Sequence, residues 1–154
     1  MNHGLRSSQV DMDTVSPIER SRIMARVKSE GNKSTESAVV ALLREARLSG
    51  WRRHYPLEGK PDFVFPQKRI ALFVDGCFWH GCQKHCRIPH TNRNYWINKI
   101  SANTKRDNRV RRHLRVKGWT VIRIWEHAIK TRSISLMIEK IKKAHPTTLL
   151  KRKI

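Results

Sequence analysis

The chain has 154 residues, a length that fits one domain with a hydrophobic core of its own. It contains 33 Lys and Arg residues but only 12 Asp and Glu residues, so the formal net charge is +21. This charge favours a polyanion as partner, because each phosphate neutralised by a cation releases counterions; an anionic membrane surface is the weaker alternative. No run of about 20 apolar residues and no apolar signal segment is present, so we expect a cytoplasmic protein.

The N-terminal part predicts a polar arm and two helices. Residues 1–15 carry no hydrophobic pattern and are expected to form a flexible arm. The Ser-Pro-Ile-Glu segment at 16–19 is typical of a capped helix start, and this helix is expected to reach residue 28. A second helix is predicted over 34–47. Glu36 lies in its first turn, where the helix dipole favours an acid even without a functional role.

The rest of the chain predicts strands and two more helices. Strands are expected at 51–57, 62–65, 70–74 and 119–125, and helices at 94–117 and from 133 onward. This order predicts an α/β protein: a single domain over residues 16–145 with a central mixed β-sheet flanked by helices. Residues 146–154 are expected to form a basic C-terminal tail.

Acidic residues are scarce, yet three of them lie around the buried strands: Glu58, Asp62 and Asp75. Two neighbouring strands that carry carboxylates near one end form a plausible Mg²⁺ site, because Mg²⁺ takes a few hard oxygen ligands and keeps its waters otherwise. Pro61-Asp62, a hydrophobic strand and then Asp75-Gly76-Cys77 follow the outline of the PD-(D/E)XK nuclease superfamily, with Cys77 at the lysine position. The pattern alone is weak, since an Asp at a strand end is common.

Three cysteines lie within ten residues, at Cys77, Cys82 and Cys86. Their crowding in a polar loop favours a tetrahedral Zn²⁺ site over a disulfide framework or a buried cluster of thiols. Such a structural site needs one more nitrogen or sulfur ligand. His85 adjoins Cys86 and is a poor partner, which leaves His127 and His90 as candidates.

Phe78, Trp79 and His80 lie inside this cysteine loop, and Trp96 follows it. Large aromatic side chains in such a place are core residues or, in a basic protein, wedges that unstack base pairs. A histidine near two acids is a satisfied structural group or a general base, because its pKa allows it to take a proton from water at neutral pH.

Together these segments resemble the very short patch (Vsr-type) DNA mismatch endonucleases over about residues 16–141. The resemblance is carried by Gly59-x-Pro61-Asp62-Phe63-Val64, Gly76-Cys77-Phe78-Trp79-His80, Trp96-x-x-Lys99-Ile100, Arg106-Asp107, Gly118-Trp119 and Trp125-Glu126. It implies a restriction-endonuclease-like fold with a structural zinc. It also implies a Mg²⁺-dependent enzyme that nicks one DNA strand beside a T:G mismatch, the lesion left by deamination of 5-methylcytosine.

The same resemblance implies roles for single residues. Asp62 would bridge the Mg²⁺ ions, with the backbone carbonyl of Val74 as a further ligand, and His80 would be the general base. Glu36 matches the acid that orients the site. The DNA wedge would consist of Phe78, Trp79 and Trp96, with Met24 reaching in from the other groove.

The chain departs from the family pattern in two places. Asp75 stands where a histidine is frequent, and we expect it to ligate a metal or to partner an active-site water. In the zinc loop, Cys82 replaces a histidine, Cys86 lies two residues farther along, and His127 replaces a cysteine. The exchange keeps four ligands and favours the set Cys77, Cys82, Cys86 and His127.

The expected partner is therefore double-stranded DNA with a T:G mismatch, bound by a monomer in a bacterial nucleoid, and mismatch-repair proteins are possible further partners. Two alternatives remain open at this stage. One is a sequence-specific nuclease on the same fold that cuts matched duplex, and the other is a non-catalytic, zinc-stapled DNA-binding protein.

Overall fold

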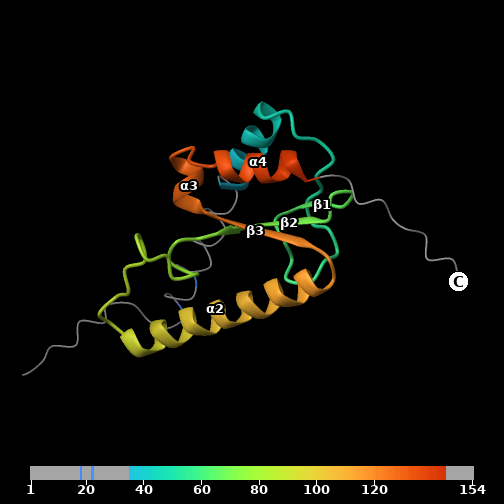
Figure 1. Ribbon diagram of the computed structural model, residues 1–154. Helices are drawn as coiled ribbons and strands as arrows, with labels where there is room; N and C mark the ends of the chain where they lie inside the picture. The colour runs from blue at the N-terminus through green and yellow to red at the C-terminus, as the bar shows by residue number, and fades with distance from the viewer. Residues whose placement is uncertain (1–17, 19–21, 23–34, 145–154) are drawn as a thin grey trace, which may run out of the picture.

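The computed structural model describes residues 18, 22 and 35–144 (Figure 1). These residues form an α/β fold, in which a three-stranded mixed sheet lies between helices. A helix at residues 35–45 comes first. It is followed by β1 (Phe63–Phe65), β2 (Ile70–Asp75), α2 (Arg93–Val116), β3 (Thr120–Trp125), α3 (Glu126–Lys130) and α4 (Ser135–Lys143). The prediction of a mixed sheet flanked by helices is confirmed.

Some predictions concern segments beyond the described part of the chain. They are the arm at 1–15, most of the helix at 16–28 including Met24, and the tail at 146–154. Within the described residues, no helix combines the length and the apolar character that crossing a membrane requires.

The sheet has the order β1-β2-β3, with β1 antiparallel and β3 parallel to β2. A four-residue turn at 66–69 joins β1 to β2, and a connection this short allows only the antiparallel arrangement. The chain reaches β3 through the long helix α2, as a parallel pairing requires. In the β2–β3 register Ile70 faces Thr120 and Asp75 faces Trp125.

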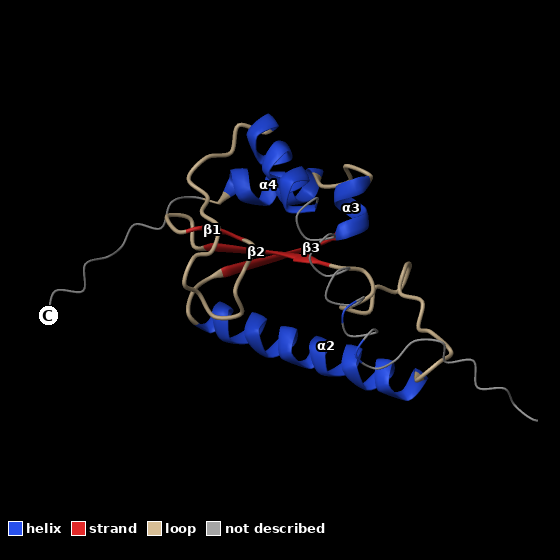
Figure 2. Cartoon of the chain, turned by 180° about the vertical axis from the view of Figure 1, so that it is seen from behind, coloured by secondary structure: helices blue, strands red, loops and turns tan. Residues whose placement is uncertain are grey.

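Alternation along β2 divides its side chains between two cores. Ile70 and Leu72 pack in a cluster with the helix at 35–45, α3 and α4, whereas Ala71 and Phe73 pack against α2. The two helical layers lie on opposite faces of the sheet (Figure 2). Because side chains of a strand alternate between its faces, Asp75 follows Ala71 and Phe73 on the α2 face. The acid at the end of β2 is therefore directed toward α2.

Residues 51–57 differ from the predicted strand. They make only an isolated antiparallel bridge, between Arg52 and Val64. His54 has a φ of 52°, in the left-handed region, and this conformation breaks the extended backbone that a strand needs. The short helix α3 after β3 was not predicted, and α4 begins at Ser135 rather than at Ser133.

The loop before β1 packs closely against α2 at Gly59. This residue has a φ of 80°, and a Cβ atom placed on it would lie 2.3 Å from Cγ1 of Val110. Gly50 offers a matched control, because its φ is 79° and a Cβ atom there would meet nothing within 4 Å.

We expect Gly59→Ala to destabilise the protein more than Gly50→Ala. Both variants place alanine in a left-handed backbone, which costs roughly 1–2 kcal/mol. Only Gly59→Ala also forces a methyl group against α2, which adds about 1–3 kcal/mol. Urea unfolding of the two variants measures the difference. Equal losses of stability would contradict the packing of this loop on α2.

Candidate active site and metal centre

Asp62 lies just before β1 and turns its carboxylate toward the end of β2. Its Oδ2 atom accepts a hydrogen bond of 2.7 Å from the backbone N–H of Val74. Burial raises the pKa of Asp62; the Val74 hydrogen bond opposes this rise, and the negative charges of Glu36 and Asp75 add to it. A carboxylate whose charge is so poorly compensated is a suitable ligand for a divalent cation.

Asp75, the last residue of β2, is only 5% exposed and pairs with Arg123 of β3. The guanidinium binds both carboxylate oxygens: Nε donates to Oδ2 at 2.6 Å and Nη2 to Oδ1 at 2.5 Å. Arg123 also lies over the ring of Phe73, with Cζ 4.9 Å from the centroid. Burial lowers the pKa of Arg123, but the hydrogen bonds and charge of Asp75, with the charges of Asp107 and Asp62, raise it above its usual value.

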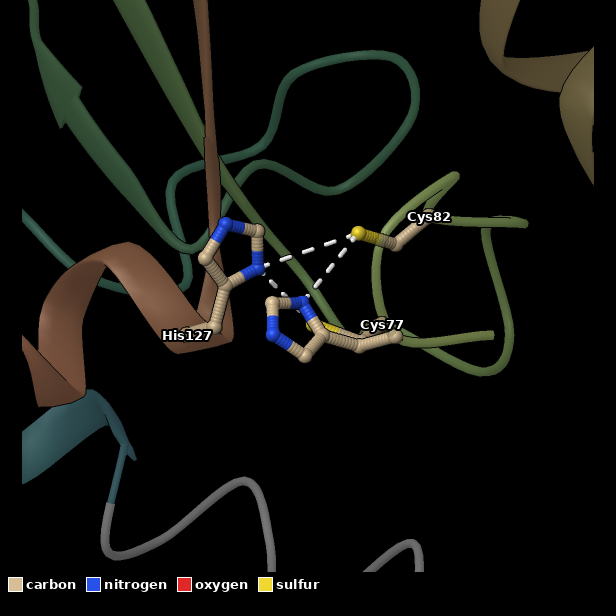
Figure 3. A group of neighbouring side chains, drawn as sticks. Cys77, Cys82 and His127 are labelled. Carbon is tan, nitrogen blue, oxygen red and sulfur yellow. Dashed lines mark hydrogen bonds between the residues drawn. The ribbon is translucent and has the colours of Figure 1, made fainter. Parts of the chain in front are cut away.

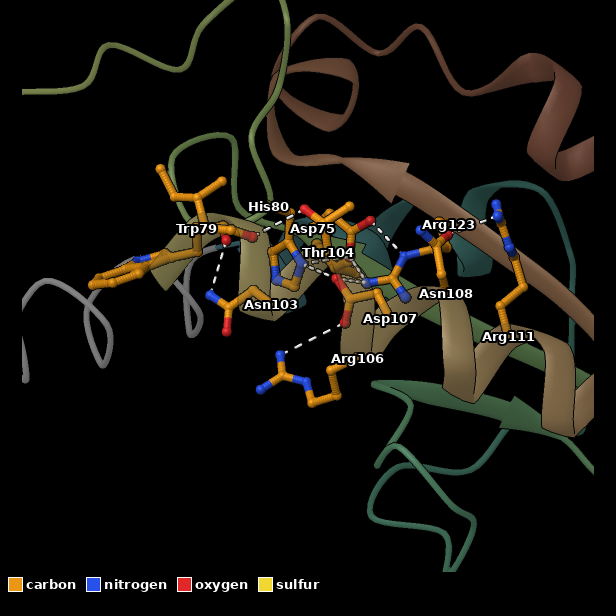
Figure 4. Close-up of polar contacts among 12 residues, drawn as sticks. Asp75, Trp79, His80, Asn103, Thr104, Arg106, Asp107, Asn108, Arg111 and Arg123 are labelled. Atoms are coloured by element: carbon orange, nitrogen blue, oxygen red, sulfur yellow. Dashed lines mark hydrogen bonds and ion pairs between the residues drawn. The ribbon is translucent and has the colours of Figure 1, made fainter. Parts of the chain in front are cut away.

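His80 connects this ion pair to α2. Its Nδ1 atom lies 2.5 Å from Oδ2 of Asp107 and 3.9 Å from Oδ1 of Asp75. The same Oδ2 atom of Asp107 lies 3.2 Å from Nη2 of Arg123. Figure 4 shows these side chains converging from the loop after β2, from β3 and from α2. The predicted residues Asp75 and His80 are therefore neighbours, and Asp62 is close enough to Asp75 for their charges to interact.

This geometry allows His80 to accept a proton. An anionic oxygen close to Nδ1 favours the tautomer that carries the proton on Nδ1 and donates it to Asp107. The lone pair on Nε2 is then free to take a proton from a water molecule.

Glu36 lies in the first turn of the helix at 35–45 and forms an ion pair with Arg53. Both residues line a pocket of about 570 Å³ that also includes Asp62 and Lys60. The pocket gives access to the Asp62 carboxylate from a side that carries both acidic and basic groups.

A group of four metal-ligand side chains lies at the ends of β2 and β3: Cys77, Cys82, His85 and His127. The Sγ atom of Cys77 lies 3.2 Å from Nδ1 of His127, and Sγ of Cys82 lies 3.7 Å from Nδ1 of His85 and 3.8 Å from Nδ1 of His127. Figure 3 shows the side chains of Cys77, Cys82 and His127 pointing toward one another. In a zinc tetrahedron, bonds of about 2.3 Å to sulfur and 2.0–2.1 Å to nitrogen separate the two ligand atoms by about 3.5 Å. The spacing therefore fits a four-coordinate metal.

The protonation of this group also fits metal binding. Burial raises the pKa of the Cys77 thiol; the backbone hydrogen bond of His127 opposes this rise, and Cys82 adds to it. Desolvation lowers the pKa of His127, helped by the positive charges of His85 and Lys84, so its imidazole stays neutral. A metal ion binds a cysteine as the thiolate and a histidine as the neutral imidazole, so the neutral imidazole of His127 is already in the form that binds a metal.

The four-residue group differs from the ligand set expected from the sequence. It contains His85, which had been considered a poor partner, and not Cys86. The Sγ atom of Cys86 instead lies 3.6 Å from the backbone oxygen of Phe78. His85 and His127 stack with ring centroids 4.3 Å apart. His85 and Cys86 are adjacent in sequence, yet only His85 has its ligand atom within this group.

The predicted aromatic wedge residues form one cluster. Phe78 lies with its ring centroid 5.2 Å from that of Trp79 and 5.3 Å from that of Trp96, all with steeply inclined planes. Trp96 is only 6% exposed, whereas Tyr95, 5.0 Å from it, is 57% exposed. Trp96 therefore lies beneath the cluster, and Phe78 and Trp79 are partly accessible. Asn103 of α2 holds the loop by donating a hydrogen bond to the backbone oxygen of Trp79.

Two residues at this site received no functional role from the sequence: Asp107 and Arg123. Arg106-Asp107 is one of the segments that carry the family resemblance, but a single acid in a strongly basic helix does not by itself indicate which residue it contacts. The sequence does contain a sign that Arg123 has a partner, because this residue interrupts the apolar run of β3 between Ile122 and Ile124. A charge within a half-buried strand needs a partner, and an acid on the neighbouring strand is the natural one.

Comparisons with known proteins agree on one family. The profile of the DNA mismatch endonuclease Vsr family matches residues 12–87. The type II nicking enzyme V.XorIIP of Xanthomonas oryzae pv. oryzae is 41% identical over 117 residues, which cover 74% of this chain and 84% of that one. DNA mismatch endonuclease Vsr of Escherichia coli is 34% identical over 116 residues, or 73% of this chain and 72% of that one.

A further relative matches over a shorter region. The type II nicking enzyme V.NaeI of Lentzea aerocolonigenes is 50% identical over 68 residues, which are 44% of this chain and 41% of that enzyme. Two relatives are thus more than 30% identical over most of their own length. This chain belongs to the Vsr family and is a DNA endonuclease.

Proposed function

We propose that this endonuclease nicks one strand of duplex DNA beside a T:G mismatch in a Mg²⁺-dependent reaction, and so begins repair of deaminated 5-methylcytosine. One observation carries the proposal. The under-compensated carboxylate of Asp62 and the His80–Asp107 pair lie at the same end of β2, linked through Asp75. A metal ligand and a proton acceptor are thereby adjacent, on a β1–turn–β2 unit that we assign to the PD-(D/E)XK type.

Asp62 and the backbone carbonyl of Val74 are the groups that would hold Mg²⁺. The raised pKa of Asp62 supports this role, because a divalent cation relieves the repulsion that the carboxylate experiences from Glu36 and Asp75. A bound Mg²⁺ supplies a Lewis acid that activates water and neutralises charge on the phosphate. The hydrogen bond from the Val74 N–H fixes the orientation of the Asp62 carboxylate.

His80 then takes a proton from the attacking water through Nε2, while Asp107 holds its Nδ1–H. Glu36 keeps Arg53 at the pocket beside Asp62, where its cation would face a DNA phosphate. Metal ligand, base and phosphate contact thus come from different segments that the sheet brings together.

The four-ligand group would bind Zn²⁺ and leave it no open coordination position, which is the arrangement of a structural site. Its ligands join the loop after β2 to His127 at the start of α3. Phe78, Trp79 and His80 lie inside that loop. The zinc would therefore fix the aromatic wedge and the general base at once.

The wedge would read the mismatch through the cost of unstacking DNA. Inserting Phe78 and Trp79 between base pairs costs a few kcal/mol, and this cost is lower at a mismatched step. Trp96 would support both rings from beneath. Exposed cations of α2 are available for the backbone phosphates: Arg93, Lys99, Lys105, Arg106, Arg109, Arg111, Arg112 and Arg115.

We expect the full-length protein to nick one strand of a T:G duplex in Mg²⁺ buffer and to leave matched duplex and other mismatches largely intact. Nicking should stop when Mg²⁺ is omitted and return when it is added back. Duplexes labelled on one strand at a time identify the strand that is cut. Equal cutting of matched duplex would favour a sequence-specific nuclease, and binding without any nick would favour a non-catalytic DNA-binding protein.

We expect Asp62→Asn to reduce nicking by more than about 100-fold while binding to the T:G duplex survives. Loss of binding with intact cleavage would refute the role of Asp62.

The same variant should raise thermal stability at neutral pH without added Mg²⁺. A raised pKa in the folded state means that the stability contribution of Asp62 is present below its ordinary value of 3.8 and is lost as pH rises through the folded value. Asparagine removes this penalty and can still accept the Val74 hydrogen bond. In thermal melts, the gain in stability of Asp62→Asn should disappear below pH 3.8. An equal gain at all pH values would show that it does not come from the charge of Asp62.

We expect the purified protein to contain one zinc per chain by elemental analysis. Cys82→Ser and His85→Ala should lose it and melt at a lower temperature, because each removes one of four ligands. Cys86→Ser is the matched control and should keep its zinc. If His85→Ala keeps its zinc and Cys86→Ser loses it, the ligand set expected from the sequence is the correct one. If the parent protein contains no zinc, the zinc site does not exist.

A further inference from the structure

Arg123 is the only basic residue in the three described strands, and its side chain is 18% exposed. It contacts two carboxylates of the site. Both oxygens of Asp75 accept its hydrogen bonds, at 2.6 and 2.5 Å, and Oδ2 of Asp107 lies 3.2 Å from Nη2. The ring of Phe73 packs on the guanidinium and restrains its plane.

We propose that Arg123 is the positioning residue of this site: it keeps Asp75 away from the cation that Asp62 holds, and it fixes Asp107 against His80. The proposal rests on the proposed function, in which Asp62 is a Mg²⁺ ligand. It makes Asp75 a supporting residue of the site and excludes it from the metal ligands, which is one of the two roles expected for it from the sequence.

The first reason is the competition for the oxygens of Asp75. A bidentate pair with a guanidinium occupies both oxygens with charge-assisted hydrogen bonds. A cation at either oxygen would have to use the remaining lone pair, beside a fixed positive charge that repels it. Asp62 accepts instead from the neutral Val74 N–H, which leaves its charge available to a metal.

The second reason is the charge of the site. Asp62, Asp75 and Asp107 carry three negative charges in their ionised forms, and Arg123 carries one positive charge that interacts with all three. The remaining two negative charges match one divalent cation. Without Arg123 the site would hold one more negative charge, and Asp75 would be free to bind a metal.

The third reason is the shared oxygen of Asp107. His80 and Arg123 both approach Oδ2, at 2.5 and 3.2 Å. Two contacts from different elements restrain the rotation of this carboxylate, and hence the imidazole that it orients. The direction of Nε2 of His80 therefore depends on Arg123 of β3, which acts through Asp107.

Mn²⁺ binding to the DNA-free, zinc-loaded protein tests the proposal, measured by electron paramagnetic resonance or calorimetry. Asp75→Asn keeps the shape of Asp75 and a carbonyl that accepts from Arg123. We expect it to lower Mn²⁺ affinity by less than about threefold, the effect of losing one charge that is already paired. A fall of about tenfold or more would make Asp75 a ligand and overturn the proposal.

Arg123→Met should raise Mn²⁺ affinity by about tenfold, because it frees Asp75 as a second carboxylate ligand. The double variant Arg123→Met/Asp75→Asn should return to the affinity of the parent, and it also removes the unpaired buried charge that could prevent the single variant from folding. Tighter binding that persists in the double variant, or an affinity of Arg123→Met equal to that of the parent, would contradict the proposal.

The positioning of His80 is read from nicking at saturating Mg²⁺ and DNA. The double variant should be about 10–100-fold slower in single turnover although its Mn²⁺ affinity is normal, because Asp107 has lost its second restraint. Arg123→Lys, which keeps the charge but not the planar fork, should recover part of the rate. If Arg123→Met/Asp75→Asn nicks as fast as the parent, Arg123 does not position His80.

Asp62→Asn separates these failures from a failure of the proposed function. It must lose Mn²⁺ affinity if Asp62 is the ligand. Unchanged affinity in that variant would reject the metal site itself, whatever Arg123 does.

Discussion

The parallel register between β2 and β3 determines the arrangement of the whole site. Asp75 faces Trp125 across the two strands, so the residues that follow each strand leave the sheet at the same edge. Cys77 and His127 each come two residues after that pair, and their ligand atoms meet at 3.2 Å. On the α2 face the same register places Arg123 beside Asp75. A shift of one residue would send both sets of side chains to the wrong faces.

The second constraint is electrostatic. In a chain with a formal charge of +21, the acids of the described site are gathered around the end of β2. They are not equivalent. Asp75 and Asp107 contact Arg123 directly, whereas the charge of Arg123 reaches Asp62 only at longer range; Asp62 accepts a hydrogen bond from the Val74 N–H and lies near two further acids. In the proposed mechanism this difference directs a cation to Asp62, while Asp75 and Asp107 hold the histidine and the sheet in place.

The sequence was sufficient for the elements whose patterns are local. The apolar run of β2, the long basic helix α2 and the cysteine loop all follow from spacing and composition. The segment at 51–57 was wrongly predicted as a strand, because Trp51 and Tyr55 suggest one while the left-handed conformation of His54 prevents its pairing.

Partnerships between distant segments were harder to predict. Arg123 lies 48 residues from Asp75, and Asp107 lies 27 residues from His80, so no local pattern joins them. His85 was set aside because it adjoins Cys86, although side-chain direction in a folded loop decides which neighbour can reach a metal. The resemblance to the Vsr family suggested roles for Asp62 and His80, but the Asp75–Arg123 pair became visible only in three dimensions.

A crystal structure of the protein bound to a T:G duplex in Mn²⁺, with anomalous scattering recorded for manganese and zinc, tests the central claim most directly. The account predicts a manganese peak coordinated by the carboxylate of Asp62 and the carbonyl of Val74, with Asp75 still paired to Arg123. It also predicts a separate zinc peak among Cys77, Cys82, His85 and His127. A manganese ion held by Asp75, or none at Asp62, would contradict it.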